Sequence, residues 1–590
     1  MQSGKKHPAR LLPILFCALA MLLVACGGPA SSQPGQTGSS HAPTSKQIAI
    51  VPEEGISDIA TFDPAITTDF SSEMAIQMVF TGLVQVDDNG NLQPQLAASY
   101  HLESDGLTWT FHLRPNLRFS DGTPLTSQDV AYSIDRALQP ATKSNTAPIY
   151  LALVKDSDKL VAGKIKTIIG DSLLTPDPNT IKIIANKKAA YFLDALSYPT
   201  SFVVEKSLVD KYGNTRFTDH LTEGGGDGPW KVAEYTHGKQ IVFVPNTNYY
   251  GPRPQLRKVV FPFYKEADTT YKAYQVNQVD VTSTISIPTP DLPAARALPA
   301  HQFHQVPQLW ISYLTMNYLV KPFDNIKIRQ AFDLALNKDL IAHDIYKDTV
   351  IATNHIVPQG MPGYNANLTG PGGVKGTSGN PTLARQLFTE GLAEEGLTLA
   401  TLPPITVTFS SSGSNDIRND LAAQQQMWQN TLGVSVKLDD IDFNRLLSES
   451  TAATNNPKGL MLWEIAWIAD YPDAQDWTTL QFDKGVPNNN MNYGQNNASD
   501  ASTQQQTQQA LEAADINADA NSRLQAYYQA EQQLVNDVAW APIYQVALSY
   551  LQKPCVVGYT IGSEGLIAPN DWANIYKSTN PSCADTSSYQ

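Results

Sequence analysis

Segments with the apolar period of a strand alternate with segments that have the period of a helix along most of this 590-residue chain. This alternation limits the fold more than any other feature. Between Leu107 and Phe119, for example, Trp109, Phe111 and Leu113 recur at every second position, as a half-buried strand requires. No internal repeat with a period of about 20 to 50 residues is found, which argues against a solenoid. We therefore predict a mixed α/β fold.

The segment that follows shows the helical part of the pattern. Val130, Ile134 and Ala137 lie on one face of a helix that we expect to begin near Thr126 or Ser127, with Ser127 as the candidate cap. Further strands are predicted at 45–52, 180–185, 239–246, 405–410 and 434–438, and further helices at 189–196, 324–346, 381–391 and 419–433. The glutamine-rich segments 502–516 and 522–539 are predicted to be exposed helices. About 545 residues after the leader exceed what one hydrophobic core holds, so two or three domains are expected.

The N-terminus has the features of an export signal. Basic residues within the first ten positions precede an apolar run that is too short to span a bilayer comfortably. The run ends in "LVAC", which resembles the lipobox of bacterial lipoproteins and makes Cys26 the candidate lipidation site. We interpret residues 1–25 as a signal peptide and residues 26–45, rich in Gly, Pro, Ser and Thr, as a flexible tether. An ordinary signal peptide with a chance cysteine is the alternative.

The charge balance limits the partners of the protein. The chain has 41 Lys and Arg against 56 Asp and Glu, which gives a net charge of −15. A surface this acidic argues against nucleic acid and against anionic lipid as partners.

Two cysteines remain for the mature protein, since Cys17 leaves with the signal peptide and Cys26 would carry lipid. They are Cys555 and Cys583, both near the C-terminus. In an exported chain a disulfide can persist, so these residues are a candidate pair, with two independent free thiols as the alternative.

Acids and aromatic residues are concentrated in "WEIAWIADYPDAQDW", residues 463–477. Asp470, Asp473 and Asp476 recur at every third position, but Pro472 argues against a continuous helix that would place them on one face. A catalytic carboxylate pair is therefore not implied, and the stretch lacks the spacing and the turn glycine of a calcium loop. The two terminal tryptophans are interpreted as packing residues, and Asp473 and Asp476 as surface acids.

Several long segments share a further pattern. They are "TWTFHLRPNLRFSDGTPLTSQDVAYSIDRAL", "GPWKVAEY", "NTNYYGPRPQLRKVVF", "YLTMNYLVKPFDNIKIRQAFDLALNKDLI", "WIADYPD" and "YYQAEQQLVNDVAWAPIY". Together they resemble the solute-binding lipoproteins of bacterial ABC importers, in the class that binds peptides, nickel chelates and some oligosaccharides. "WIADYPD" and the C-terminal "VVGYTIGSEGLIAPNDWANIY" are similar to the oligopeptide-binding branch in particular.

This resemblance implies a two-lobed clamp of the type II periplasmic-binding-protein kind with an additional accessory α/β domain. Lobe I would consist of residues 46–90, 200–310 and 540–590. The accessory domain would comprise 91–199, and lobe II would comprise 311–539. Strands that cross between the lobes would form the hinge, and closure would bury the ligand.

The resemblance also implies the site residues. In oligopeptide binders the aspartate of W-x-A-D-Y pairs with the α-ammonium group of the ligand, and the matching residue here is Asp470. Trp467 matches a pocket tryptophan, which would offer a flat apolar wall. The backbone expected to flank an extended peptide and bond its main chain belongs to Ala466, Gly82, Leu83 and Val84.

Some positions depart from the family pattern. Relatives that take tripeptide-like ligands have an arginine three positions before the tryptophan, where it holds the ligand carboxylate, but this chain has Glu464 there. Arg418 is the candidate replacement, and an exposed helical arginine is the alternative interpretation. A disulfide of the same relatives is absent, because the matching positions are Trp310 and Ile468. Ligand length and recognition of the ligand C-terminus therefore stay open.

These observations predict a lipid-anchored receptor that captures an oligopeptide between two lobes and delivers it to a membrane permease with its own ATPase. We expect a monomer on the outer face of the cytoplasmic membrane, with no cofactor, no metal and no catalytic residue. The same scaffold with an oligosaccharide or a nickel chelate as ligand is the alternative. An exported hydrolase is a hypothesis from another class.

Overall fold

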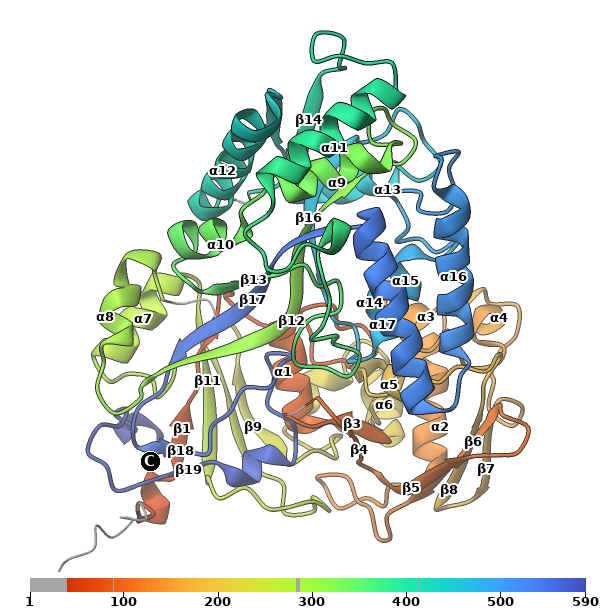
Figure 1. The fold of residues 1–590 in the computed structure, drawn as a ribbon. Coiled ribbons are helices and arrows are strands. Elements are labelled where there is room, and N and C mark those ends of the chain that lie inside the picture. The colour runs from red at the N-terminus through yellow and green to blue at the C-terminus, as the bar shows by residue number, and fades with distance from the viewer. Residues whose placement is uncertain (1–39, 89, 283–286, 412) are drawn as a thin grey trace, which may run out of the picture. The chain divides into compact units, whose positions relative to one another are not determined.

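The computed structural model describes residues 40–88, 90–282, 287–411 and 413–590. The predicted signal peptide, Cys26 and the part of the tether before Ser40 lie outside these described residues. Residues His41–Gln590 form one unit, in which several sheets alternate with helices (Figure 1). The predicted mixed α/β class is confirmed.

A five-stranded sheet brings the start of the described chain against a segment much later in the sequence. Strand β1 (Ile48–Ile50) pairs in parallel with β11 (Lys258–Tyr264), and β2 (Glu53–Glu54) pairs with the same strand. The sheet continues through β10 (Gln240–Pro245) and β9 (Trp230–Thr236). Its core also contains side chains from the C-terminal segment, among them Trp572, so the two ends of the described chain share one hydrophobic cluster.

A four-stranded antiparallel sheet forms a second layer, seen at the lower right of Figure 1. Its order is β5 (Ala97–Leu102), β6 (Thr108–Leu113), β8 (Thr180–Ile184) and β7 (Leu173–Asp177). Helix α2 (Ser127–Leu138) packs on this sheet and buries Val130, Ile134 and Ala137, as the helical pattern predicts. Thr126 rather than Ser127 is the N-cap, because its backbone N–H donates to Asp129 Oδ2 at 2.8 Å and closes a capping box.

Two long strands connect different parts of the unit. Strands β12 (Phe303–Met316) and β17 (Ala541–Leu551) pair antiparallel and cross Figure 1 diagonally. They belong to a six-stranded sheet with β13 (Val350–Ala352), β16 (Leu462–Ile468), β14 (Ile405–Phe409) and β15 (Val436–Asp440). Leu314 and Ile543 lie in one hydrophobic core, whereas Leu548 and Tyr550 lie in the core of the five-stranded sheet. Both strands therefore pass from one core to another. The residue ranges predicted for the lobes, and the hinge between them, stay predictions.

The longer helices cover the sheets and carry the buried stripes predicted for them. In α9 (Ile326–Leu334), capped by Asn325, the residues Ile328, Ala331 and Phe332 are fully buried. The other helices are α1 (Phe70–Val79), α3 (Ala147–Tyr150), α4 (Ser157–Val161), α5 (Phe192–Ala195), α6 (Lys206–Tyr212), α7 (Ala267–Gln275), α8 (Leu292–Arg296), α10 (Lys338–Leu340), α11 (Pro381–Glu394), α12 (Asn415–Leu432), α13 (Phe443–Thr451), α14 (Ala474–Trp477), α15 (Thr479–Phe482), α16 (Ala501–Asp515) and α17 (Ala520–Asp537).

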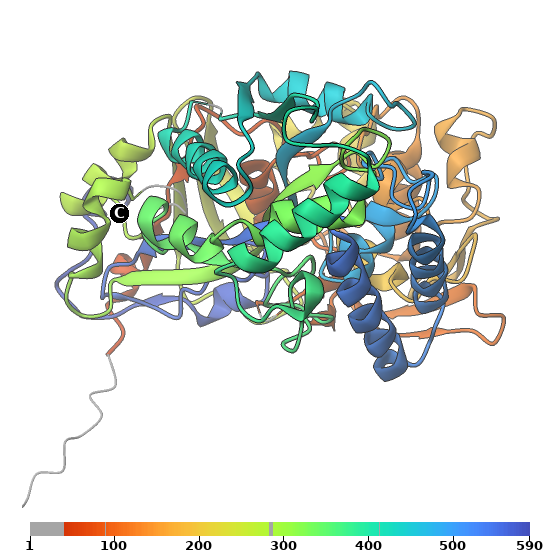
Figure 2. The ribbon, with the colours of Figure 1, turned by 45° about the horizontal axis from the view of Figure 1, so that its top comes forward.

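The glutamine-rich helices α16 and α17 run side by side (Figure 2). Their prediction as exposed surface is wrong in part, because Gln504 and Gln508 of α16 are buried. Gln508 Nε2 donates to the backbone carbonyls of Phe482 and Tyr493 at 2.7 and 2.9 Å. These amides satisfy buried backbone groups, which a glutamine can do without carrying charge into the core.

The remaining described strands form two short antiparallel pairs. Strand β3 (Val84–Val86) pairs with β4 (Leu92–Pro94), and β18 (Val556–Val557) pairs with β19 (Tyr576–Lys577). A disulfide joins Cys555 to Cys583, with a Cα–Cα distance of 5.6 Å. It fastens the C-terminal segment to the chain just before β18.

Candidate ligand-binding site

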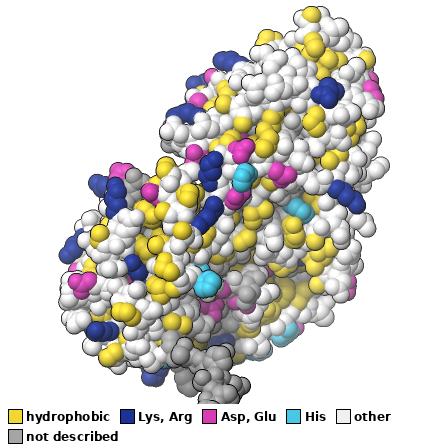
Figure 3. All heavy atoms as spheres, turned by 60° about the vertical axis from the view of Figure 1, so that its left-hand side comes forward, with side chains coloured by type: hydrophobic (Ala, Val, Ile, Leu, Met, Phe, Trp, Pro, Cys, Tyr) yellow, Lys and Arg dark blue, Asp and Glu magenta, His cyan; other side chains and the backbone are white. Residues whose placement is uncertain are grey.

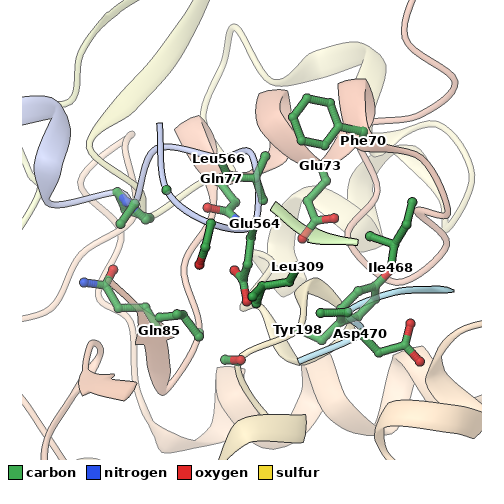
Figure 4. A pocket seen from close by; sticks show the side chains of 18 of the residues that line it. Phe70, Glu73, Gln77, Gln85, Tyr198, Leu309, Ile468, Asp470, Glu564 and Leu566 are labelled. Carbon is green, nitrogen blue, oxygen red and sulfur yellow. The ribbon is translucent and has the colours of Figure 1, made fainter. Parts of the chain in front are cut away.

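A cavity of about 430 Å³ opens where segments from distant parts of the chain meet (Figure 4). Its walls come from the start of α1, from β3, from the loop after β16, and from the loop after β18. The lining includes Asp69, Glu73, Gln77, Thr81, Gly82, Gln85, Asp87, Asp88, Tyr150, Tyr198, Asp470 and Glu564. The size is within the range of small-molecule and short-peptide sites.

The glycine-rich junction at 224–228 positions one wall of this cavity. Asp227 is fully buried and accepts hydrogen bonds from the backbone N–H of Thr81 at 2.9 Å and from its hydroxyl at 2.8 Å. Gly226 approaches the end of α1 so closely that an added Cβ would lie 2.3 Å from the carbonyl oxygen of Val79. The junction therefore fixes the turn from α1 into Gly82, and a larger residue at Gly226 would displace it.

Asp470 lines the cavity from the loop between β16, which ends at Ile468, and α14, which begins at Ala474. Pro472 favours this loop, because a proline disfavours the helical conformation of the residue before it. Its backbone N–H donates to Asp476 Oδ2 at 3.2 Å, which holds the loop. Burial raises the pKa of the Asp470 carboxyl to about 6, and a hydrogen bond with Tyr150 opposes this shift. Among the described residues, no Lys, Arg or His forms an ion pair with Asp470.

Asp473 and Asp476 are not surface acids, so that interpretation is wrong. Asp473 is 6% exposed and forms a bidentate pair with Arg523 of α17, at 2.7 and 2.6 Å. Asp476 is fully buried and accepts a hydrogen bond from the Trp467 indole at 3.1 Å. Both residues build the loop that presents Asp470. Trp463 and Trp477 are fully buried packing residues, as predicted.

Glu73 and Glu564 are among the lining carboxyls that the sequence did not reveal. Glu73 stands on α1, and Glu564 stands on the loop after β18 (Figure 4). Burial and, to a smaller extent, the charge of Glu564 together raise the pKa of Glu73 to about 8. Burial also raises the pKa of Glu564 to about 7. The only signal in the sequence was the resemblance of the segment around Glu564 to oligopeptide binders.

The other predicted site residues lie at different distances from the cavity. Gly82 lines it, and an added Cβ there would lie 3.0 Å from Phe202 Cδ1. Leu83 and Val84 are buried beside it. Ala466 pairs with Ser312 within the six-stranded sheet. Trp467 is outside the cavity lining, so its role as a wall stays a prediction.

Arg418 and Glu464 also lie outside the lining of this cavity. Arg418 is largely exposed near the start of α12, where its Nε pairs with Asp440 at 3.1 Å. Glu464 is 6% exposed and accepts a hydrogen bond from Gln424 at 2.8 Å. Burial and the nearby Asp420 raise the pKa of Glu464 well above its usual range. A role for Arg418 in binding the ligand carboxylate therefore stays a prediction.

Two features are absent from the described part of the chain. No group of three or more His, Cys, Asp or Glu side chains there is arranged to hold a metal ion. No described helix combines the length and the apolar character needed to cross a bilayer.

The fold and the cavity define a two-lobed α/β binding protein. The family model of the bacterial extracellular solute-binding proteins, family 5 middle region, matches residues 91–489. The chain belongs to this family. Its members are non-enzymatic receptors of solute transport that act outside the cytoplasm, which does not support the hydrolase hypothesis.

Curated relatives and solved structures agree with this assignment. The chain is 25% identical to the oligopeptide-binding protein OppA of Bacillus subtilis, over 81% of this chain and 85% of that protein. It is 26% identical to the periplasmic oligopeptide-binding protein OppA of Escherichia coli, over 85% and 88%. The unliganded open form of the murein tripeptide-binding protein MppA has a TM-score of 0.75 at 23% identity, covering 92% of this chain and 99% of that one. This structural likeness confirms the predicted clamp fold.

Proposed function

We propose that this protein is a lipid-anchored receptor that binds an oligopeptide in the cavity and delivers it to the permease of an ABC importer. The observation that carries the proposal is the Asp470 carboxyl, which lines the cavity without a cationic partner among the described residues. A peptide α-ammonium group brings a positive charge and three hydrogen-bond donors. The resulting charge-assisted bond strengthens as the surrounding water is excluded.

Two strand edges support an extended main chain as the rest of the ligand. Strand β3 pairs only with β4 in the described structure, so its other edge is open toward an added strand. Strand β14 pairs with β16 only at Leu462 and Trp463. The later part of β16, with Ala466, therefore has β12 on one side and no described strand on the other. Open edges can bond the backbone of a peptide without reading its side chains.

The relatives named above support the same ligand class, since two of them are named as oligopeptide-binding proteins and the third as a murein tripeptide-binding protein. In our proposal, binding stabilises a closed form and the permease recognises that form, which links ligand affinity to closure. Strands β12 and β17 are the proposed hinge, because they run between the two cores.

The proposed anchor is a lipid on Cys26, with the protein acting as a monomer at the outer face of the cytoplasmic membrane. Detergent phase separation of cell extracts tests the anchor. The native chain should enter the detergent phase, and the Cys26→Ser variant should stay in the aqueous phase or retain its leader. Equal partition of both proteins would contradict lipidation.

Mass spectrometry of the purified protein tests the ligand. We expect peptides to be released on denaturation, and calorimetry with tetraalanine on the stripped protein to give binding heat. A cello-oligosaccharide and a nickel chelate serve as comparison ligands. If one of these bound and no peptide did, the peptide assignment would fail while the receptor scaffold would stand.

A further inference from the structure

We propose that the ligand of this receptor carries a second positive charge on a basic side chain, and that Glu73 and Glu564 form the subsite for it. The inference rests on the proposed function, because Asp470 is assigned to the α-ammonium group. It names a class of peptide, those with Lys or Arg near the N-terminus, rather than peptides in general.

The first support is the position of the two glutamates. Glu73 projects from α1 and Glu564 from the loop after β18, and both line the cavity that holds Asp470 (Figure 4). Glu73 hydrogen-bonds Gln77 of its own helix. Glu564 has no hydrogen-bond or ion-pair partner among the described residues. Neither glutamate therefore has a cationic partner within the part of the chain that the structure describes.

The second support is the charge of the whole lining. Six acids and no Lys, Arg or His line the cavity within the described ranges. Three of the acids have structural partners: Asp69 caps α1 by accepting from Ser72 N at 2.9 Å, Asp87 accepts from Gln93 Nε2 at 3.0 Å, and Asp88 accepts from Ala568 N at 2.9 Å. On the outer face shown in Figure 3, by contrast, Lys and Arg are scattered among the acids. Asp470, Glu73 and Glu564 are left for the ligand.

An independent sign of a missing donor comes from Gln85. This residue lines the same cavity, is 7% exposed, and lies on the other side of the view from Asp470 (Figure 4). Its Oε1 is buried and accepts no hydrogen bond from any described residue. A buried acceptor without a donor costs stability, and a turn of the Gln85 side chain toward a donor in the cavity would satisfy it. Lys brings three donors and Arg brings five, and neither brings an acceptor.

One α-ammonium group balances only one of the three lining carboxyls that accept no backbone hydrogen bond from the described residues. Because the Glu73 carboxyl lies near Glu564, Asp69 and Asp470, their charges raise its pKa in addition to the effect of burial. Tyr198 also faces this group and brings no charge of its own, because burial and the charges of Glu73, Asp470 and Asp69 raise its pKa above the ordinary value. A basic side chain would remove the repulsion and keep the glutamates ionised. The chemistry of the lining thus favours a dication over a monocation.

Calorimetry with a peptide scan tests this inference. Lysine is placed in turn at each position of tetraalanine, and norleucine at the same position supplies an equal apolar stem without the charge. At one position we expect lysine to bind about 10- to 100-fold more tightly than norleucine, as for a charge-assisted hydrogen bond. The variant with Glu73→Gln and Glu564→Gln should bind the two peptides within about 3-fold of each other. The variant Glu512→Gln, which changes an exposed pair with Lys484, is the matched control and should keep the full preference.

The outcomes separate the two proposals. Equal affinity for lysine and norleucine peptides at every position would overturn the proposal that the ligand carries a second positive charge. Peptide binding itself would still stand. A lysine preference that survives in the double variant would overturn the assignment to Glu73 and Glu564. If no peptide of either kind bound to the stripped protein, the proposed function itself would fail. Thermal melting of each variant verifies that it is folded.

Discussion

Asp470 and Asp473 stand three positions apart on one loop, yet their surroundings are opposite. Asp473 is held by both guanidinium nitrogens of Arg523, at 2.7 and 2.6 Å. Asp470 faces the cavity with a tyrosine hydroxyl and no cation among the described residues. The first carboxylate is part of the structure, and the second is free for a ligand. The role of an acid is therefore decided by its partners and not by its residue type or its spacing in the sequence.

The largest expected effect is a loss of stability when the ion pair between Asp473 and Arg523 is broken. Replacing Arg523 by leucine leaves Asp473 buried without its partner, which we expect to lower the free energy of unfolding by about 3 to 5 kcal/mol. Urea denaturation measures this change. The matched control is Arg445→Leu, which breaks an exposed pair with Glu449 and should cost about 0.5 kcal/mol or less. Equal losses in the two variants would show that the buried pair has no structural role.

Substitution of Asp470 should lower ligand affinity rather than the free energy of unfolding. Asp470→Asn keeps the shape of the side chain and removes the charge, so we expect affinity for tetraalanine to fall about 10- to 100-fold. The free energy of unfolding should not decrease, because no ion pair is lost and a half-buried charge is removed. Calorimetry and urea denaturation on the same preparation measure both. A stability loss as large as that of Arg523→Leu would contradict the distinction between the two acids.

The pH dependence of stability sharpens the same contrast. The pKa values of Asp470, Glu73 and Glu564 are raised to about 6, 8 and 7, so the folded protein binds more protons than the unfolded chain over this range. Their favourable contribution is therefore complete below the unfolded values near 4 and is lost as the pH rises through about 6 to 8. Denaturation of the ligand-free protein should show stability falling over this window.

The variant with Glu73→Gln and Glu564→Gln provides the control for that pH dependence. Its stability should fall less steeply between about pH 5 and pH 9, because the two groups no longer titrate. Over the same window, affinity of the native protein for the preferred lysine peptide should rise with pH, since the ligand binds the ionised carboxylates. If stability fell equally with pH in the two proteins, the pH dependence could not be assigned to Glu73 and Glu564.

The smallest expected effect concerns Arg418. Its pair with Asp440 is exposed, so Arg418→Ala should change the free energy of unfolding by about 1 kcal/mol or less. Calorimetry with tetraalanine and its C-terminal amide tests whether this arginine binds the ligand carboxylate. If the variant lost the preference for the free carboxylate, the prediction made for Arg418 would be supported, and an unchanged preference would remove it from the site.

Local patterns in the sequence predicted much of the fold but only part of the site. The periods in β6, α2 and α9 are set by residues that share one face of one element, so one sequence is enough to find them. Asp470 was identified through family resemblance. Glu73 was missed because nothing near α1 indicates that the loop carrying Glu564 packs against it. Asp473 was misassigned for the same reason, since its partner Arg523 belongs to a later helix. Pairings between distant segments leave no local pattern.

The most direct test of the central claim is a double-mutant cycle between Asp470 and the peptide amine. Calorimetry would compare tetraalanine with N-acetyl-tetraalanine on the native protein and on Asp470→Asn. We expect acetylation to weaken binding to the native protein about 10- to 100-fold and to change binding to the variant by less than about 3-fold. Equal affinity of the native protein for both peptides, or the full effect of acetylation in the variant, would contradict it.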